Sequence, residues 1–174
     1  MNNNLISNII RFLILIFIQV GLFKNMGYYS LATPFPYILF ILLLPIGLSN
    51  FMLFVIALLT GLTVDAFYDS VGVHAAACVA LAWFRIFFHR ITLDIDAQES
   101  LNTPSWGNMG FKWFGTYVVL STLAHHIVLF FVEVFSFKNF LNTLSSIVLS
   151  SVFTIVLIFI IGIVTYRRKS RLAS

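Results

Sequence analysis

The stretch at residues 61–81, GLTVDAFYDSVGVHAAACVAL, lies between two long apolar runs and contains Asp65, Asp69 and His74. Asp, Ser and Gly at residues 69–72 are residue types that favour chain reversals. We therefore expect the end of one membrane helix, a tight turn and the start of the next helix. Acidic groups near hydrocarbon are costly, so each aspartate either caps the turn at the water interface or makes a specific hydrogen bond.

Small residues in the same stretch favour close helix packing. Alanines follow the turn and allow a neighbouring helix to approach, and a glycine in the turn permits a backbone angle or an approach that other residues resist. Carboxylate and imidazole groups both bind divalent metals, but their spacing here matches no metal motif, so we expect no metal and no cofactor. The candidate structural or partner-binding residues are Gly61, Asp65, Asp69, Gly72 and His74.

The composition indicates an all-α integral membrane protein with a single transmembrane domain over residues 1–174. Hydrophobic residues make up 60% of the chain and charged residues 9%, against roughly 25% charged in an ordinary soluble domain. The mean hydropathy is +1.02. A soluble fold of this length does not bury that much apolar surface.

Apolar runs predict a bundle of six transmembrane helices. A 28-residue apolar run at residues 37–64 is interrupted by Pro45, Gly47, Ser49 and Asn50, which favours two short helices there. A single kinked helix is the alternative and gives five spans. The six expected helices cover residues 5–23, 37–48, 51–66, 73–88, 113–132 and 144–166.

Positive charge sorts to one side of such a bundle. With six helices, the side shared by the two termini carries Arg90, Lys112 and a basic tail, while Lys24 and Lys138 fall on the other side. The positive-inside rule then places both termini in the cytoplasm. The basic tail comprises Arg167, Arg168, Lys169 and Arg171. Directly after a membrane span, such a tail sets topology and contacts anionic lipid, and we expect no nucleic-acid partner.

Catalytic motifs are missing from the sequence. There is no G-x-S-x-G, H-E-x-x-H, glycine-rich phosphate loop or C-x-x-C pattern. His125 and His126 are adjacent, so they point to different faces of a helix and do not easily bind one ion. Because no nucleophile, base and orienting residue can be named together, we expect a protein that is not an enzyme.

The central stretch also carries a family resemblance. The pattern G-L-x-x-D, a short gap and then G-x-H-A resembles the rod shape-determining protein family MreD. Its residues here are Gly61, Leu62, Asp65, Gly72, His74 and Ala75. The length, the number of apolar segments and the basic C-terminus agree with that family along nearly the whole chain.

The resemblance implies a function and a set of partners. Members of the family belong to the machinery for cell shape and cell-wall (peptidoglycan) elongation in the bacterial inner membrane. It implies binding to MreC, and indirect linkage to MreB, RodA and a class B penicillin-binding protein. It also implies a fold similar to the six-helix substrate-binding subunits of energy-coupling-factor transporters. A homo-oligomer is compatible with the sequence.

A second function follows from taking that fold similarity literally. The chain would then be a membrane subunit that binds a small, vitamin-like molecule, with Gln19, Asp65, His74 and His125 lining the pocket. Such sites need several convergent polar groups, and this sequence offers few. We therefore favour the interaction protein over the transporter subunit.

Overall fold

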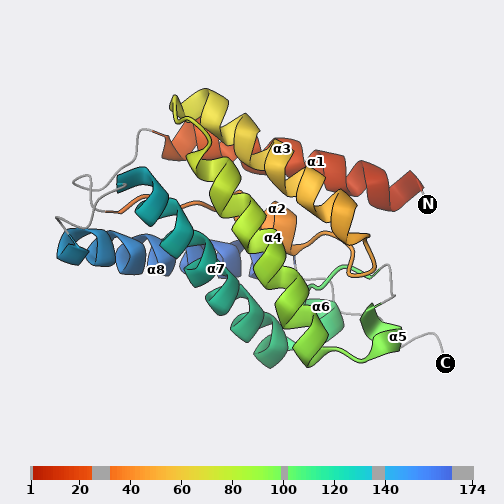
Figure 1. The fold of residues 1–174 in the computed structure, drawn as a ribbon. Helices are drawn as coiled ribbons and strands as arrows, with labels where there is room; N and C mark the ends of the chain where they lie inside the picture. The colour runs from red at the N-terminus through yellow and green to blue at the C-terminus, as the bar shows by residue number, and fades with distance from the viewer. Residues whose placement is uncertain (1, 25–31, 99–101, 135–139, 166–174) are drawn as a thin grey trace.

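The fold comes from a computed structural model that describes residues 2–24, 32–98, 102–134 and 140–165. Its long helices are α1 (Asn2–Ile18), α3 (Asn50–Tyr68), α4 (Val73–Thr92), α7 (Phe111–Val134) and α8 (Phe140–Val164) (Figure 1). The π-helical turn η1 (Gln19–Phe23) continues α1, and the short helices are α2 (Ile38–Leu42), α5 (Ile95–Gln98) and α6 (Trp106–Met109). The basic tail and Lys138 lie outside the described ranges.

The prediction of an all-α fold is confirmed for the described residues, and long apolar helices agree with a membrane protein, but the count of six long helices is not confirmed. Five helices there are long and apolar enough to cross a bilayer. The expected helix over residues 37–48 is replaced by α2, which has five residues. Pro34 and Pro36 precede α2 and Pro45 follows it, so helical geometry is disfavoured on both sides.

The single kinked helix, which was the alternative, is not formed either, although its count of five spans agrees with the five long apolar helices. The chain leaves helical geometry after Leu42, and α3 begins afresh at Asn50. Ser49 caps α3, because its hydroxyl accepts a hydrogen bond from the Met52 amide at 3.4 Å. With 19 residues, α3 is a full-length span rather than the short helix expected over residues 51–66. The expected helices over residues 73–88 and 113–132 were a few residues too short, whereas the last one begins earlier than expected, at Phe140, and ends at Val164 rather than at residue 166.

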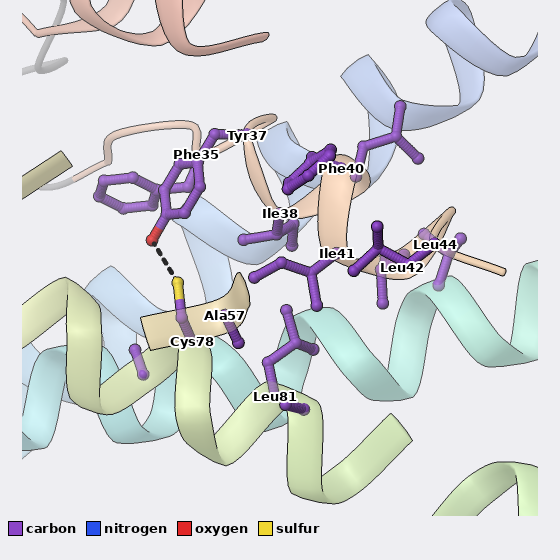
Figure 2. Close-up of a cluster of buried hydrophobic side chains, with 14 of the residues drawn as sticks. Phe35, Tyr37, Ile38, Phe40, Ile41, Leu42, Leu44, Ala57, Cys78 and Leu81 are labelled. Atoms are coloured by element: carbon purple, nitrogen blue, oxygen red, sulfur yellow. Dashed lines mark hydrogen bonds between the residues drawn. The ribbon is translucent and has the colours of Figure 1, made fainter. Parts of the chain in front are cut away.

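Residues 33–46, which we call the interior segment, lie inside the bundle. Within this segment Tyr37, Ile38, Ile41 and Leu42 have no solvent-exposed surface. Figure 2 shows their side chains among those of the surrounding helices, including Ala57, Cys78 and Leu81. The interior segment therefore forms the centre of the hydrophobic core.

Contacts along the interior segment show that it runs lengthwise through the bundle. Tyr37 contacts His74 near the start of α4, whereas the carbonyl of Pro45 accepts a hydrogen bond from Arg85 further along that helix. This part of α4 spans about 16 Å at roughly 1.5 Å per residue. The interior segment thus returns the chain through the bundle after α1, although most of it is not helical.

This return places both ends of the helical chain at the same end of the bundle. Arg11, in the first half of α1, reaches the carbonyl of Leu43 near the end of the interior segment. Gly162, near the end of α8, lies beside the rings of Phe114 and Trp106. We call this the α1-start end of the bundle, and we call the opposite end, where α3 turns into α4, the hairpin end.

Side chains from the long helices bond to the backbone of the interior segment. Hydroxyl groups of Ser150 and Thr154 accept hydrogen bonds from the amides of Thr33 and Phe35 at 3.0 and 2.9 Å. Donors from four helical positions reach its carbonyls: Gln19 to Pro34, Tyr117 to Leu42, Arg11 to Leu43, and Arg85 to Leu44 and Pro45. Backbone polar groups that no helix or sheet satisfies are thereby paired in an apolar environment.

Thr154→Val tests this pairing, because valine keeps the shape of threonine but can neither accept the hydrogen bond from the Phe35 amide nor bond to His126. A buried donor left without an acceptor costs about 1–3 kcal/mol, so we expect a clear fall in the melting temperature in detergent. Thr63→Val is the matched control, since the Thr63 hydroxyl bonds only to the Leu59 carbonyl of its own helix. Equal melting temperatures for the two variants would contradict this account.

Candidate functional site

The turn between α3 and α4 depends on two residues with positive φ. Asp69 ends α3 at φ 55°, and its amide donates to the carbonyl of Asp65. Gly72 precedes α4 at φ 78°, a backbone region that glycine enters without the steric cost of a Cβ atom. The turn thus lies at residues 69–72, and the reversal is tight enough to bring the start of α4 against the end of α3.

The carboxylate of Asp65 caps the start of α4. One oxygen accepts hydrogen bonds from the His74 amide at 3.0 Å and the Ser70 hydroxyl at 2.7 Å, and the other accepts from the Ala75 amide at 2.9 Å. Two of the three donors are backbone amides of α4, and the His74 side chain is not among them. An acidic group near the C-terminus of α3 is unfavourable there, but the positive end of the α4 dipole lies next to it.

The backbones of α3 and α4 approach each other closely at Gly61. A Cβ atom at this position would lie 2.6 Å from both the Ala75 nitrogen and the His74 carbonyl oxygen. Backbone atoms cannot move aside as the end of a flexible side chain can. Gly61 therefore brings Asp65 near enough to cap α4, and the two residues act as one packing unit.

The His74 side chain belongs to a buried polar cluster centred on Tyr37. The Tyr37 hydroxyl lies 3.1 Å from His74 Nδ1, 2.9 Å from His125 Nε2 and 3.7 Å from the Cys78 sulfur. Figure 2 shows the contact between Tyr37 and Cys78. The interior segment, α4 and α7 thus meet at one phenol group.

His126 extends this cluster toward α8. Its Nδ1 lies 2.8 Å from the Thr122 carbonyl and its Nε2 lies 3.2 Å from the Thr154 hydroxyl. His125 and His126 have no exposed surface. His125 bonds to Tyr37 and His126 to Thr154, but the two rings are not apart: their Nδ1 atoms are 3.5 Å from each other and both rings contact Phe35. A group acting on a substrate needs access to it, and these two histidines are enclosed.

A polar pocket of about 240 Å³ opens beside the α3–α4 turn. We call it the hairpin-end pocket. Its polar lining residues are Lys24, Thr33, Tyr68, Ser70, His74 and Glu133. Of the four residues expected to line a ligand pocket, His74 does so. Gln19, Asp65 and His125 are buried and engage protein groups; for example, Gln19 donates to the Tyr68 hydroxyl at 2.7 Å.

The described residues contain no group of three His, Cys, Asp or Glu side chains that could hold a metal ion. Asp69 is exposed in the turn, whereas Asp65 is buried and fully engaged with α4. The arrangement of Asp65, Asp69 and His74 is thus that of a helix cap and a turn.

Sequence reasoning did not identify Tyr37, Arg85, Ser150 and Thr154 as important for the interior of the bundle. Each is a polar residue within an apolar run, and this is the signal that could have found them. Polar groups inside a membrane span usually face the bundle interior, and these four do. The sequence did not reveal that Arg85, Ser150 and Thr154 bond to the backbone of the interior segment. Nor did it reveal that Tyr37 bonds to side chains of α4 and α7.

Comparison of the chain with known protein families, curated proteins and solved structures finds no match. The resemblance to MreD, and to the transporter subunits in fold, therefore stays a prediction.

Replacing Asp65 tests its role as the cap of α4. Asp65→Leu removes every acceptor and should lower stability by about 2–3 kcal/mol, because buried amides lose their partners. Asp65→Asn keeps one oxygen but turns an amino group toward one of the donors, so a loss of about 1 kcal/mol is expected. Asp69→Asn is the control and should be neutral, since asparagine tolerates a left-handed backbone. Detergent melting of all three variants makes the measurement, and an Asp65→Leu melting curve like that of the control would contradict the cap.

Gly61→Ala tests the close approach of the two helices. Its methyl group would overlap the α4 backbone, so we expect a loss of about 1–3 kcal/mol. Gly115→Ala is the matched control, because the nearest atom to its added Cβ is the tip of the Phe159 ring at 3.6 Å. Alanine also favours helix by up to about 1 kcal/mol over glycine, so the control should melt at or above the wild-type temperature. A lower melting temperature in both variants, or in neither, would contradict the close approach of α3 and α4 at Gly61.

Proposed function

We propose that the chain is a non-enzymatic, multi-pass component of the bacterial inner membrane that acts in rod-shape determination and cell-wall elongation by binding MreC. Linkage to MreB, RodA and a class B penicillin-binding protein would be indirect, through MreC. The proposal starts from the resemblance to the MreD family. It adds what the residues of that resemblance do in the fold.

The observation that carries the proposal is that the pattern G-L-x-x-D…G-x-H-A forms one structural unit. Gly61 admits the α4 backbone, Asp65 caps α4, Gly72 forms the turn, and His74 bonds to Tyr37 of the interior segment. Each of these residues serves to build the hairpin and to join it to the core. These residues thus have structural roles in the hairpin. Such roles support an interaction protein rather than an enzyme.

The surroundings of the polar groups also support a non-enzymatic role. Tyr37, His125 and His126 are enclosed and bonded to protein groups. Most of the protein's mass is in long apolar helices, whose exposed side chains include many large hydrophobic residues. Such a body suits lateral contact with other membrane proteins.

The orientation that we propose places the α1-start end in the cytoplasm. Arg11, Arg85, Arg90 and Lys112 belong to this end, and Lys24 lies at the hairpin end, where it lines the pocket. Basic residues concentrate on the cytoplasmic side of membrane proteins. The hairpin-end pocket then faces away from the cytoplasm.

The alternative is a membrane subunit that binds a small polar molecule, and the hairpin-end pocket is the observation that favours it. Lys24 and Glu133 give this pocket charges of both signs, and Tyr68, Ser70 and His74 add hydrogen-bonding groups. Its volume of about 240 Å³ is below the roughly 300–1,000 Å³ of typical ligand pockets. We therefore rank it second.

Purification of the tagged chain from its native membranes in mild detergent tests the proposal. Under the proposed function, MreC is recovered with the chain, and depletion of the chain makes rod-shaped cells lose their shape. The double variant Lys24→Gln, Glu133→Gln should recover as much MreC as wild type does, because both residues line the pocket rather than the hairpin.

A subunit that binds a small molecule would give different results in the same purification. A nucleotide-hydrolysing module would be recovered in place of MreC, and the double variant would lose a thermal shift that a small ligand produces in wild type. Recovery of that module without MreC, together with normal cell shape on depletion, would overturn the proposed function.

A further inference from the structure

A second pocket, of about 380 Å³, opens at the α1-start end of the bundle, between the turn that precedes α3 and the last turns of α4. We call it the basic pocket. Its polar lining residues are Ser49, Asn50, Arg85, His89, Arg90 and Gln98. The residues of the family resemblance and of the hairpin-end pocket are not part of it.

Arg85 supplies a buried positive charge to the wall of the basic pocket. Only 1% of its surface is exposed. Its Nη2 donates to the carbonyls of Leu44 and Pro45 at 2.6 and 2.9 Å, and its Nε has no hydrogen-bond partner within the described ranges. Carbonyl groups orient the guanidinium but do not neutralise it. A buried cation without an anionic partner is costly, so an anion is the missing component.

His89 contributes a second buried nitrogen, although its ring packs against Trp113 and Tyr117. This residue is 5% exposed and lies one helical turn after Arg85 on the same helix. Its Nε2 has no hydrogen-bond partner among the described residues. Native structures rarely leave buried polar groups unpaired. Both residues that carry these unpaired nitrogens line the basic pocket, which favours a ligand that accepts hydrogen bonds there.

The N-terminus of α3 adds to the positive potential of the basic pocket. Ser49 and Asn50 form the start of this 19-residue helix and line the pocket. The first amides of a helix lack intrahelical acceptors, and the helix dipole is positive at this end. Exposed Arg90 lies on the same pocket. The described lining residues include no carboxylate, so the helix end and both arginines favour an anion.

The position of the basic pocket matches the level of lipid headgroups. It lies where the apolar span of α3 begins and that of α4 ends. Large hydrophobic side chains next to it in sequence are exposed on both helices, namely Phe51, Met52, Phe87 and Ile91. A molecule with a phosphate in the pocket could therefore lay acyl chains along these side chains.

We propose that the basic pocket binds a phosphate group, as presented by the headgroup of an anionic phospholipid or by free phosphate. Arg85 and the start of α3 form its fixed wall, and Arg90 closes on the phosphate from the exposed side. The hairpin-end pocket is not equivalent, because Glu133 lines it and would repel an anion. The proposal is independent of whether the chain binds MreC.

Native mass spectrometry tests the lipid source. Protein purified in a neutral detergent is mixed with phosphatidylglycerol and phosphatidylcholine, and the ratio of the two lipids retained is measured. Wild type should prefer phosphatidylglycerol. Arg90→Gln should weaken this preference by about fivefold, the effect of one basic residue at an anionic surface. Lys112→Gln is the matched control, because Lys112 is exposed, belongs to the same end and is not among the residues that line the pocket.

Asn50→Asp gives a second variant that should fold. An acidic residue in the first turn of a helix is stabilising, but here it would repel a phosphate. We expect the preference for phosphatidylglycerol to fall at least as far as in Arg90→Gln, while the lipid-free protein melts at or above the wild-type temperature. An equal fall in Arg90→Gln and Lys112→Gln, or no fall in Arg90→Gln and Asn50→Asp, would overturn the site.

Inorganic phosphate distinguishes the two sources. If the ligand is free phosphate, this salt should raise the melting temperature of lipid-free wild type, relative to chloride at the same ionic strength, and should not do so for Arg90→Gln. If the ligand is a lipid, phosphate alone should have no effect while the preference for phosphatidylglycerol persists. Failure of both the salt and the anionic lipid to bind preferentially would overturn the proposal.

Discussion

A peptide chain that crosses the bundle without forming a full helix must still find partners for its backbone amides and carbonyls. In hydrocarbon, an unpaired backbone group costs several kcal/mol. The interior segment meets this requirement with side chains from the helices around it, among them Thr154, Tyr117 and Arg85. Those helices are thereby fixed in register along the segment, since each donor or acceptor has one position at which it reaches its partner. The arrangement of the bundle thus follows from satisfying one buried stretch of backbone.

The same constraint explains how far the sequence could predict the fold. Apolar runs located all five long helices, because length and hydropathy suffice to identify a membrane span. The interior segment has similar hydropathy, so it was taken for a sixth helix. The interior segment differs from the long helices in being enclosed by them, not in its composition. Pro34, Pro36 and Pro45 disfavour a helix, and a non-helical backbone is tolerated there only because the surrounding helices supply its hydrogen bonds. The periodicity of one sequence does not show whether other helices will enclose a segment and bond to its backbone.

The candidate site was predictable to the extent that its chemistry is local. Asp69 and Gly72 lie in a turn that their residue types predict, and the Asp65 carboxylate engages residues within ten positions of it. His74, by contrast, meets Tyr37 and, through it, His125. These partners are distant in the chain, and only the path of the interior segment brings them together. The sequence therefore predicted the hairpin but not the cluster beneath it.

The two ends of the bundle differ in how fully a buried charged side chain is paired with groups of the protein. At the hairpin end, the Asp65 carboxylate accepts hydrogen bonds from two amides of α4 and a serine hydroxyl, so groups of the protein itself stabilise its charge. At the other end, Arg85 is held by neutral carbonyls, and the described lining of its pocket provides no carboxylate. A charge satisfied internally serves structure, whereas a charge that is positioned but not neutralised is available to a ligand. This contrast, rather than the number of basic residues, is what distinguishes the basic pocket as a site.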